Sequence, residues 1–317
     1  MVSVLTRPAE VRAASGGQRR RRRRRGQASG YLFLSPWIIG AALLTIGPMA
    51  FSLYLSFTDY DLFTSPKWVG TQNYVRMFTQ DDHYWDAVQV TVKYVVISVP
   101  LQLGLALAVA LLLNQPRRGR GFYRSAFYAP SLLGASVSVA LVWRAMFGSG
   151  GSVDRVLRVF GIHTGSWIDQ PKYALLSLVA LSVWQFGAPM VIFLAGLKQI
   201  PRDLYEAAAI DGAGPARRFV SVTLPMLSPV LLFNLVLAII HAFQAFTSAY
   251  VISNGRGGPS DSTLFYTLYL YQRGFTDFRM GYAAAMAWVL LVVIAVITAA
   301  VFRSARRWAF YAGEDQR

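Results

Sequence analysis

The chain has 317 residues, of which 55% are hydrophobic and only 15% are charged, and its mean hydropathy is +0.40. Soluble domains usually carry about 25% charged residues, so this composition excludes an ordinary soluble protein. Cysteine is absent, which excludes disulfide scaffolds, thiolate metal sites and cysteine nucleophiles.

Half of the net charge of +16 lies in residues 1–30, which hold nine arginines and one glutamate. This Gly-, Ser- and Arg-rich segment has too few large apolar residues to fold, so we expect a disordered tail. The seven arginines at 19–25 would suit nucleic-acid binding, but ahead of an apolar segment we expect a cytoplasmic anchor. That apolar segment is too long for a cleaved signal peptide.

Six segments are apolar enough to cross a bilayer, which needs about 20 such residues per helix. Backbone amides in hydrocarbon must be satisfied within the segment, and the runs lack strand alternation, so we expect helices. The expected spans are Tyr31–Phe57, Val88–Leu113, Ala126–Phe147, Tyr173–Leu197, Met226–Tyr250 and Ala283–Phe302. The predicted fold class is an all-α integral membrane protein with six transmembrane helices.

Basic residues alternate between the segments that connect these spans. Lysine and arginine number 21 in the tail, loops 114–125 and 198–225 and the end 303–317, but eight in loops 58–87, 148–172 and 251–282. The positive-inside rule therefore places both termini and the two more basic loops in the cytoplasm.

The longest cytoplasmic loop, residues 198–225, has internal order. Pro201 can begin a short helix because its missing N–H would be unpaired there. Gly212 breaks this helix, and Gly214-Pro215 restarts the chain in a new direction. Two short helices with alanines on one face are typical of a compact knob that a partner can approach closely. They are equally typical of an interfacial helix on lipid headgroups, and these residues leave both open.

The same loop carries a recognisable motif. It begins with Glu206-Ala207-Ala208, followed after three residues by Gly212, after nine more by Val222 and after one more by Leu224-Pro225. This pattern resembles the cytoplasmic motif of binding-protein-dependent ABC importer permeases, in which isoleucine usually stands at the position of Val222. Other segments resemble the sugar-type branch with the maltose and glycerol-3-phosphate permeases: SFTDYD at 56–61, GTQNYVRMF at 70–78, ALLLNQPRRGRGFYRSAFYAP at 110–130, FLAGLKQIPRDLYEAAAIDGA at 193–213 and Gly257-Gly258-Pro259. The resemblance covers Tyr31 to Phe302 and implies the type I importer fold.

By this resemblance, the motif loop is a coupling helix that docks on a cytoplasmic ATPase. The implied coupling residues are Glu206, Ala207 and Gly212 for contact, with Ala208, Asp211, Leu224 and Pro225 supporting the geometry. The chain itself lacks a phosphate-binding loop, because none of its four lysines follows a glycine. Energy must come from another chain or an ion gradient. We expect no cofactor on this chain, and ATP and Mg on the partner ATPase.

Polar side chains inside spans are costly and are functional candidates by default. Asn234 and His241 are seven residues apart and share a helical face. A sugar offers hydroxyl pairs and apolar C–H faces, which suit neighbouring amides and rings. The candidate substrate-path residues are Asn234, His241, Gln244, Phe246 and Tyr250. Each of these residues would also suit packing against a partner permease. Gln102 and Gln185 are further polar residues within spans, and they would equally suit hydrogen bonds between helices.

The favoured function is the membrane-spanning subunit of an ATP-driven importer for an oligosaccharide, polyol or glycerol phosphate. The implied partners are a second permease, two ATPase subunits, an extracytoplasmic solute-binding protein and the lipid of a bacterial cell membrane. An ion-coupled secondary carrier is the alternative, although residues 31–145 and 170–302 show no clear inverted repeat. A scaffold that binds nucleic acid through the arginine run is a third class, and we expect no such partner.

The expected division of the chain follows from these assignments. It comprises a tail at 1–30, a first helix and outward loop at 31–87, a permease core at 88–302 and a cytoplasmic tail at 303–317. We expect no catalytic residues. We also expect no metal site, since the three histidines at 83, 163 and 241 are widely scattered.

Overall fold

The computed structural model describes residues 33–116, 118–134, 136–161 and 165–309. The predicted tail at 1–30 and the last residues of the segment 303–317 lie outside them. The chain divides into two units, Met1–Tyr54 and Leu55–Arg317. Residues Phe33–Ser56 are helical throughout, with a π-helical turn, η1 (Ala42–Ile46), ahead of α2 (Gly47–Ser56). This helix matches the first expected span.

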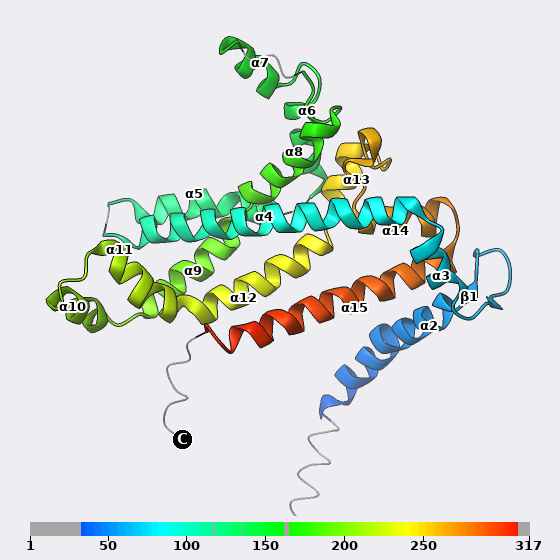
Figure 1. Ribbon diagram of the computed structural model, residues 1–317, viewed down its shortest axis with the longest axis horizontal. Helices are drawn as coiled ribbons and strands as arrows, with labels where there is room; N and C mark the ends of the chain where they lie inside the picture. The colour runs from blue at the N-terminus through cyan, green and yellow to red at the C-terminus, as the bar shows by residue number, and fades with distance from the viewer. Residues whose placement is uncertain (1–32, 117, 135, 162–164, 310–317) are drawn as a thin grey trace, which may run out of the picture. The chain divides into compact units, whose positions relative to one another are not determined.

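The second unit is built around three long helices: α4 (Asp82–Asn114), α12 (Leu224–Phe243) and α15 (Met280–Ala305). α12 packs on α4 and α15, and it also packs on α9 (Gly187–Gln199), as Figure 1 shows. Among the described residues, four helices are long and apolar enough to cross a membrane, and up to six if each of two bent pairs forms one span.

The third and fourth expected spans are bent pairs rather than single helices. α5 (Arg120–Leu133) is followed by α6 (Val137–Phe147) and α7 (Ser152–Val159) after a bend of 100°. α8 (Pro171–Trp184) and α9 meet at 41°. The expectation of a continuous helix over Ala126–Phe147 is wrong, since α5 ends at Leu133 and α6 begins at Val137. The helix breaks there because Gly134 adopts a φ of +58° and the Ser136 side chain caps α6 by accepting a hydrogen bond from the Val139 amide.

The fifth expected span lies within a single candidate span, Pro215–Ser253. It contains a short break, because α12 stops at Phe243 and a separate helix, α13 (Thr247–Ser253), follows. Between α13 and α15 lie η3 (Pro259–Asp261), α14 (Tyr266–Tyr271) and the π-helical turn η4 (Gln272–Thr276).

The expected loop 58–87 contains regular structure. β1 (Thr58–Asp59) pairs antiparallel with β2 (Lys67–Trp68), with Thr58 opposite Trp68, and α3 (Gln72–Thr79) follows. α4 begins at Asp82, six residues before the expected span, because the Asp81 side chain caps it by accepting from the Tyr84 amide.

The second unit has two distinct ends. The short helices α10 (Arg202–Ile210) and α11 (Pro215–Arg218) lie at one end of the long helices, and α3, α13 and α14 lie towards the other (Figure 1). Between them, Met190 and Phe193 of α9 and Leu227 of α12 are fully buried. Segments that the charge pattern assigns to opposite sides of a membrane therefore lie at opposite ends.

Candidate functional site

A cavity of about 500 Å³ lies among α4, α5, α6, α8, α9, α12 and α13. Its lining combines amides, hydroxyls and apolar groups, and its polar side chains include Gln102, Ser182, Gln185, Asn234, His241 and Gln244. No Asp, Glu, Lys or Arg is among the described residues that line it. Four of the five predicted substrate-path residues, Asn234, His241, Gln244 and Phe246, line this cavity, and Tyr250 contacts the ring of Phe246 at 5.3 Å.

Asn234 has unmet hydrogen-bonding capacity. Its side chain is 3% exposed, and its amide nitrogen has no hydrogen-bond partner among the described residues. Burying an unpaired amide costs about 1–3 kcal/mol in proteins. The cavity wall therefore offers a donor for which the described residues supply no acceptor.

The cavity lining also carries hydrogen bonds between helices. The Gln102 amide nitrogen donates to the Gln185 carbonyl at 3.4 Å, and that of Gln185 donates to the Gly134 carbonyl at 2.9 Å. Both side chains therefore join helices, as one of the two sequence interpretations proposed, and both also face the cavity.

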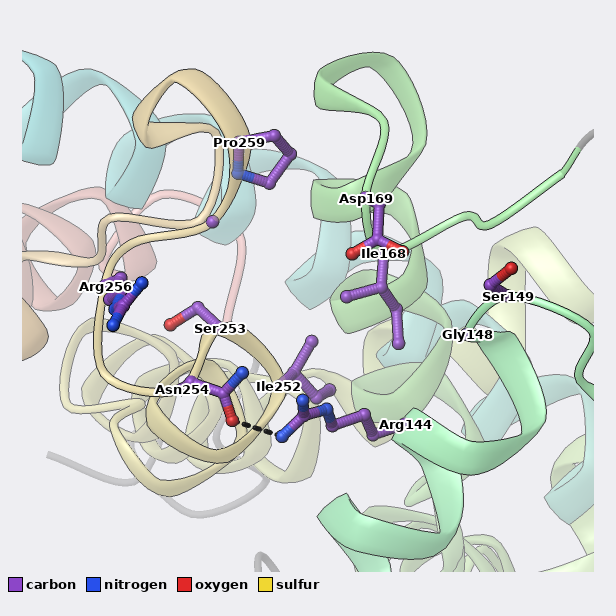
Figure 2. Close-up of a pocket in the computed structure, with 11 residues that line it drawn as sticks. Arg144, Gly148, Ser149, Ile168, Asp169, Ile252, Ser253, Asn254, Arg256 and Pro259 are labelled. Carbon is purple, nitrogen blue, oxygen red and sulfur yellow. Dashed lines mark hydrogen bonds between the residues drawn. The ribbon is translucent and has the colours of Figure 1, made fainter.

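A second pocket, of about 370 Å³, lies where α6 and α13 meet (Figure 2). The Arg144 guanidinium donates to the Asn254 side-chain oxygen and, at 3.4 Å, to the Val251 carbonyl. Arg256 and Asp169 complete its charged lining. This pocket was not predicted from the sequence, because Arg144 and Asn254 are 110 residues apart.

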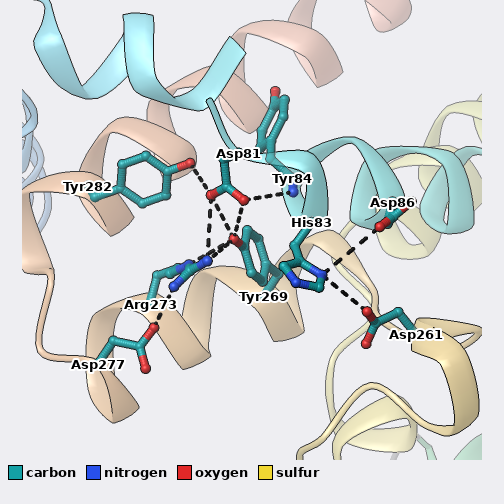
Figure 3. A network of polar contacts seen from close by, with 9 residues as sticks. All are labelled: Asp81, His83, Tyr84, Asp86, Asp261, Tyr269, Arg273, Asp277 and Tyr282. Atoms are coloured by element: carbon teal, nitrogen blue, oxygen red, sulfur yellow. Dashed lines mark hydrogen bonds and ion pairs between the residues drawn. The ribbon is translucent and has the colours of Figure 1, made fainter. Parts of the chain in front are cut away.

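A polar network ties α4 to α14 and α15 (Figure 3). The Asp81 carboxylate accepts bonds of 2.6 Å from the hydroxyls of Tyr269 and Tyr282 and lies 3.7 Å from Arg273, which pairs with Asp277 at 2.8 Å. Burial raises the pKa of Asp81, but the two tyrosine hydrogen bonds and the Arg273 charge outweigh it, so its pKa lies below 3.8. Burial also raises the pKa of Tyr269, which keeps its donating proton.

Three possible metal ligands meet beside this network. His83 Nδ1 lies 3.1 Å from the Asp261 carboxylate and 4.0 Å from that of Asp86 (Figure 3). The prediction of no metal site rested on the three scattered histidines and did not include Asp86, three residues from His83, or Asp261, which is 178 residues away. An imidazole nitrogen and two carboxylates are ligands that bind divalent cations, but all three side chains are at least partly exposed. The absence of a metal stays a prediction.

The motif loop forms a knob attached to α12. α11, the π-helical turn η2 (Phe219–Thr223) and α12 follow one another without a break, so the second short helix is the start of the fifth span. The hydroxyls of Tyr205 on α10 and Thr223 are 3.0 Å apart, and Arg218 donates to the Ala213 carbonyl at 2.7 Å. α10 is thereby fixed against the base of α12.

The surface of the knob is open. Glu206, Ala207, Asp211 and Gly212 are exposed, and Ile210 is 88% exposed. Ala208 is half-buried, as are Leu224 and Pro225 at the start of α12. Gly212 has a φ of +75°, a backbone conformation that a side chain disfavours. The turn predicted at this glycine is thus present.

Comparisons with known proteins agree with this architecture. Residues 94–309 match the family described as binding-protein-dependent transport system inner membrane component. The probable ABC transporter permease protein YesP of Bacillus subtilis is 50% identical over 289 residues, covering 91% of this chain and 94% of that protein. The lactose transport system permease protein LacF of Rhizobium radiobacter is 34% identical, covering 88% and 94%.

A solved structure shares the fold. The bacterial alginate ABC transporter, in complex with an alginate pentasaccharide-bound periplasmic protein, contains a chain that matches with a TM-score of 0.76 and 22% identity, covering 89% of this chain and 96% of that one. The fold and the relatives define a membrane-embedded permease subunit of an ABC importer, a transport component rather than an enzyme. The chain belongs to the binding-protein-dependent transport system inner membrane component family. The family resemblance read from the sequence is therefore confirmed.

Proposed function

We propose that this chain forms half of the translocation pathway of an ATP-driven importer for a sugar or sugar-like solute. Its partners are a second permease, a pair of ATPase subunits and an extracytoplasmic solute-binding protein. The family and the names of the relatives support this assignment. The observation that carries it is the cavity, with amides, hydroxyls and rings around the unpaired amide of Asn234.

The chain crosses the membrane six times, with both termini in the cytoplasm. Two of the six crossings are the bent pairs, α5 with α6 and α8 with α9. The alternation of basic loops supports this orientation. Residues 1–30 and 303–317 are cytoplasmic tails, 31–87 are the first helix with its outward loop, and 88–302 are the permease core.

The knob couples ATP hydrolysis to transport. Its exposed Glu206, Ala207 and Gly212 contact the ATPase, while Ala208, Asp211, Leu224 and Pro225 hold the geometry. A displacement of α10 passes through the Tyr205–Thr223 contact to the base of α12. The other half of α12 carries Asn234 and His241, so this helix joins the knob to the cavity wall. Rocking of packed helices then changes access to the cavity. ATP and Mg bind to the partner ATPase.

The cavity suits a polyhydroxylated solute. Asn234, His241 and Gln244 on one side offer hydrogen bonds to hydroxyl pairs, and Phe246 offers a ring for apolar C–H groups. Uncharged polar groups in an otherwise apolar cavity are typical of small-molecule sites, where a few polar contacts fix orientation.

Reconstitution tests this function. The chain, purified with its co-isolating subunits and solute-binding protein, is placed in liposomes, and uptake of labelled maltose, lactose, glycerol 3-phosphate and an alginate oligosaccharide is measured with and without internal ATP. We expect ATP-dependent uptake of at least one solute. Uptake of none of them, or uptake driven by a proton gradient without ATP, would overturn the proposal, and the second result would favour a secondary carrier.

A further inference from the structure

Four aromatic rings on α13, α14 and the segments beside them form a continuous series. The ring centroids of Phe246 and Tyr271 are 5.2 Å apart, those of Tyr250 and Tyr271 are 5.4 Å apart, and Tyr271 stacks on Phe275 at 5.1 Å. We call Phe246, Tyr250, Tyr271 and Phe275 the aromatic track. Aromatic pairs pack favourably at such separations, so the series is stable as a unit.

The track joins the cavity to the surface. Phe246 at one end lines the cavity beside Gln244. Phe275 at the other end is 56% exposed, and Tyr250 is 38% exposed. These rings are therefore only partly used in packing. Tyr250 lies on α13 and Tyr271 on α14, two helices that lie away from the knob (Figure 1).

Phe275 is held in place by an uncommon piece of backbone. It lies on the π-helical turn η4, whose Asp277 amide donates to the Gln272 carbonyl at 2.8 Å. The Gln272 side chain donates to the Gly255 carbonyl at 2.6 Å, which ties η4 to the chain that follows α13. Arg273 is in turn paired with Asp277. Single π turns occur frequently at functional sites, where they reposition a side chain.

We propose that the aromatic track is a saccharide subsite through which a chain of at least two pyranose rings passes into the cavity. This inference rests on the proposed function and narrows it from sugar-like solutes in general to oligosaccharides. The apolar C–H faces of pyranose rings pack on aromatic faces, and successive rings of the track offer successive platforms. Glycerol phosphate has no such face, and Arg273, the basic residue of η4, is already paired with Asp277 and lies 3.7 Å from Asp81.

The test compares ring-removing with ring-retaining variants in the full reconstituted complex. Tyr271→Leu and Phe275→Leu remove rings, Tyr271→Phe and Phe275→Tyr retain them, and Phe63→Leu is the matched control. Phe63 is also exposed, and its ring meets Phe278 at 5.3 Å, outside the track. The probes are maltose, lactose, maltotetraose and an alginate oligosaccharide, with glycerol 3-phosphate as the ringless probe, and recovery of the second permease is measured for each variant.

We expect each leucine variant to take up the transported oligosaccharide about two- to tenfold more slowly, as expected for the loss of one aromatic contact. The ring-retaining variants should take up the oligosaccharide faster than the leucine variants at the same positions, Phe63→Leu should match the unaltered complex, and the second permease should be recovered equally. Unchanged oligosaccharide uptake in both leucine variants, or slower uptake only where the second permease is lost, would overturn the track while leaving the proposed function intact. An unaltered complex that imports glycerol 3-phosphate alone would also overturn it. Failure to import any probe would overturn the proposed function itself.

Discussion

The side-chain amide of Gln185 donates to the carbonyl of Gly134 at 2.9 Å, which links the break between α8 and α9 to the break between α5 and α6. Each break frees backbone groups that water would satisfy in a soluble protein. Inside a membrane a neighbouring helix must satisfy them instead. The two bent spans therefore support each other next to the cavity.

Replacing Gln185 by leucine should destabilise the protein, because the Gly134 carbonyl loses its donor. We expect a cost of about 1–2 kcal/mol, the upper part of the range for interhelical hydrogen bonds in membranes. Gln102→Leu removes a longer bond, of 3.4 Å, and should cost less. Thermal unfolding in detergent measures both, and equal midpoints for the two variants would contradict the role given to Gln185.

Gly187→Ala should also destabilise the protein, because α9 begins in close contact with α5. A Cβ at Gly187 would lie 2.6 Å from the Phe127 carbonyl oxygen and 2.8 Å from the Tyr128 Cα. Overpacking of this kind typically costs about 1–3 kcal/mol. Gly104 lies within α4 with nothing within 4 Å of its Cβ position, so Gly104→Ala is the matched control. A lower unfolding midpoint is expected for the first variant alone.

Gly212→Asp should abolish uptake while the protein remains folded in the membrane. The positive φ of Gly212 disfavours a side chain by about 1–2 kcal/mol, and the strain falls on an exposed turn rather than on the core. Gly214 has a φ of −69° and open space around it, so Gly214→Ala should transport normally. Normal uptake by Gly212→Asp would contradict the coupling role of the loop.

Asn234→Leu should separate transport from stability. The Asn234 amide nitrogen is unpaired among the described residues, so leucine removes a buried polar group without breaking a bond of that nitrogen. We expect the unfolding midpoint to be unchanged or higher and uptake to fall at least tenfold. A variant that unfolds earlier and still transports would show that Asn234 is a structural residue.

Asp81 should make the stability of the protein depend on pH, because its carboxylate joins the start of α4 to α14 and α15. Its pKa is below 3.8 in the folded protein, so its stabilising contribution is present above pH 3.8 and is lost as the pH falls through the folded value. Asp81→Asn should remove this acid dependence and lower stability near neutral pH by about 1–3 kcal/mol, since charged hydrogen bonds are lost. Unfolding midpoints between pH 3 and pH 7 compare the two proteins, and parallel curves would contradict the assignment.

The sequence predicted the class of this protein well, because long apolar runs permit few structures in a bilayer. The long apolar runs indicated α4, α12 and α15, and the spacing from Glu206 to Pro225 identified the family. The seven-residue spacing of Asn234 and His241 placed them on one face, and both line one cavity. These features depend on local composition and helical geometry, which a single segment already contains.

Only the tertiary structure decided where the helices break and which distant groups meet. The helix breaks at Gly134 and Gln185 support each other, because the Gln185 side chain donates a hydrogen bond to the Gly134 carbonyl. These two residues are 51 positions apart in the sequence. Phe246 joins Tyr271 and Phe275 only after α13 and α14 fold back together. Hydrogen bonds and ring contacts across such distances require particular packing of helices, and a linear pattern of apolar residues does not specify which faces pack. The composition therefore determined a membrane protein, the motif at 206–225 identified its family, and the packing of the helices determined the cavity and the contacts among its rings.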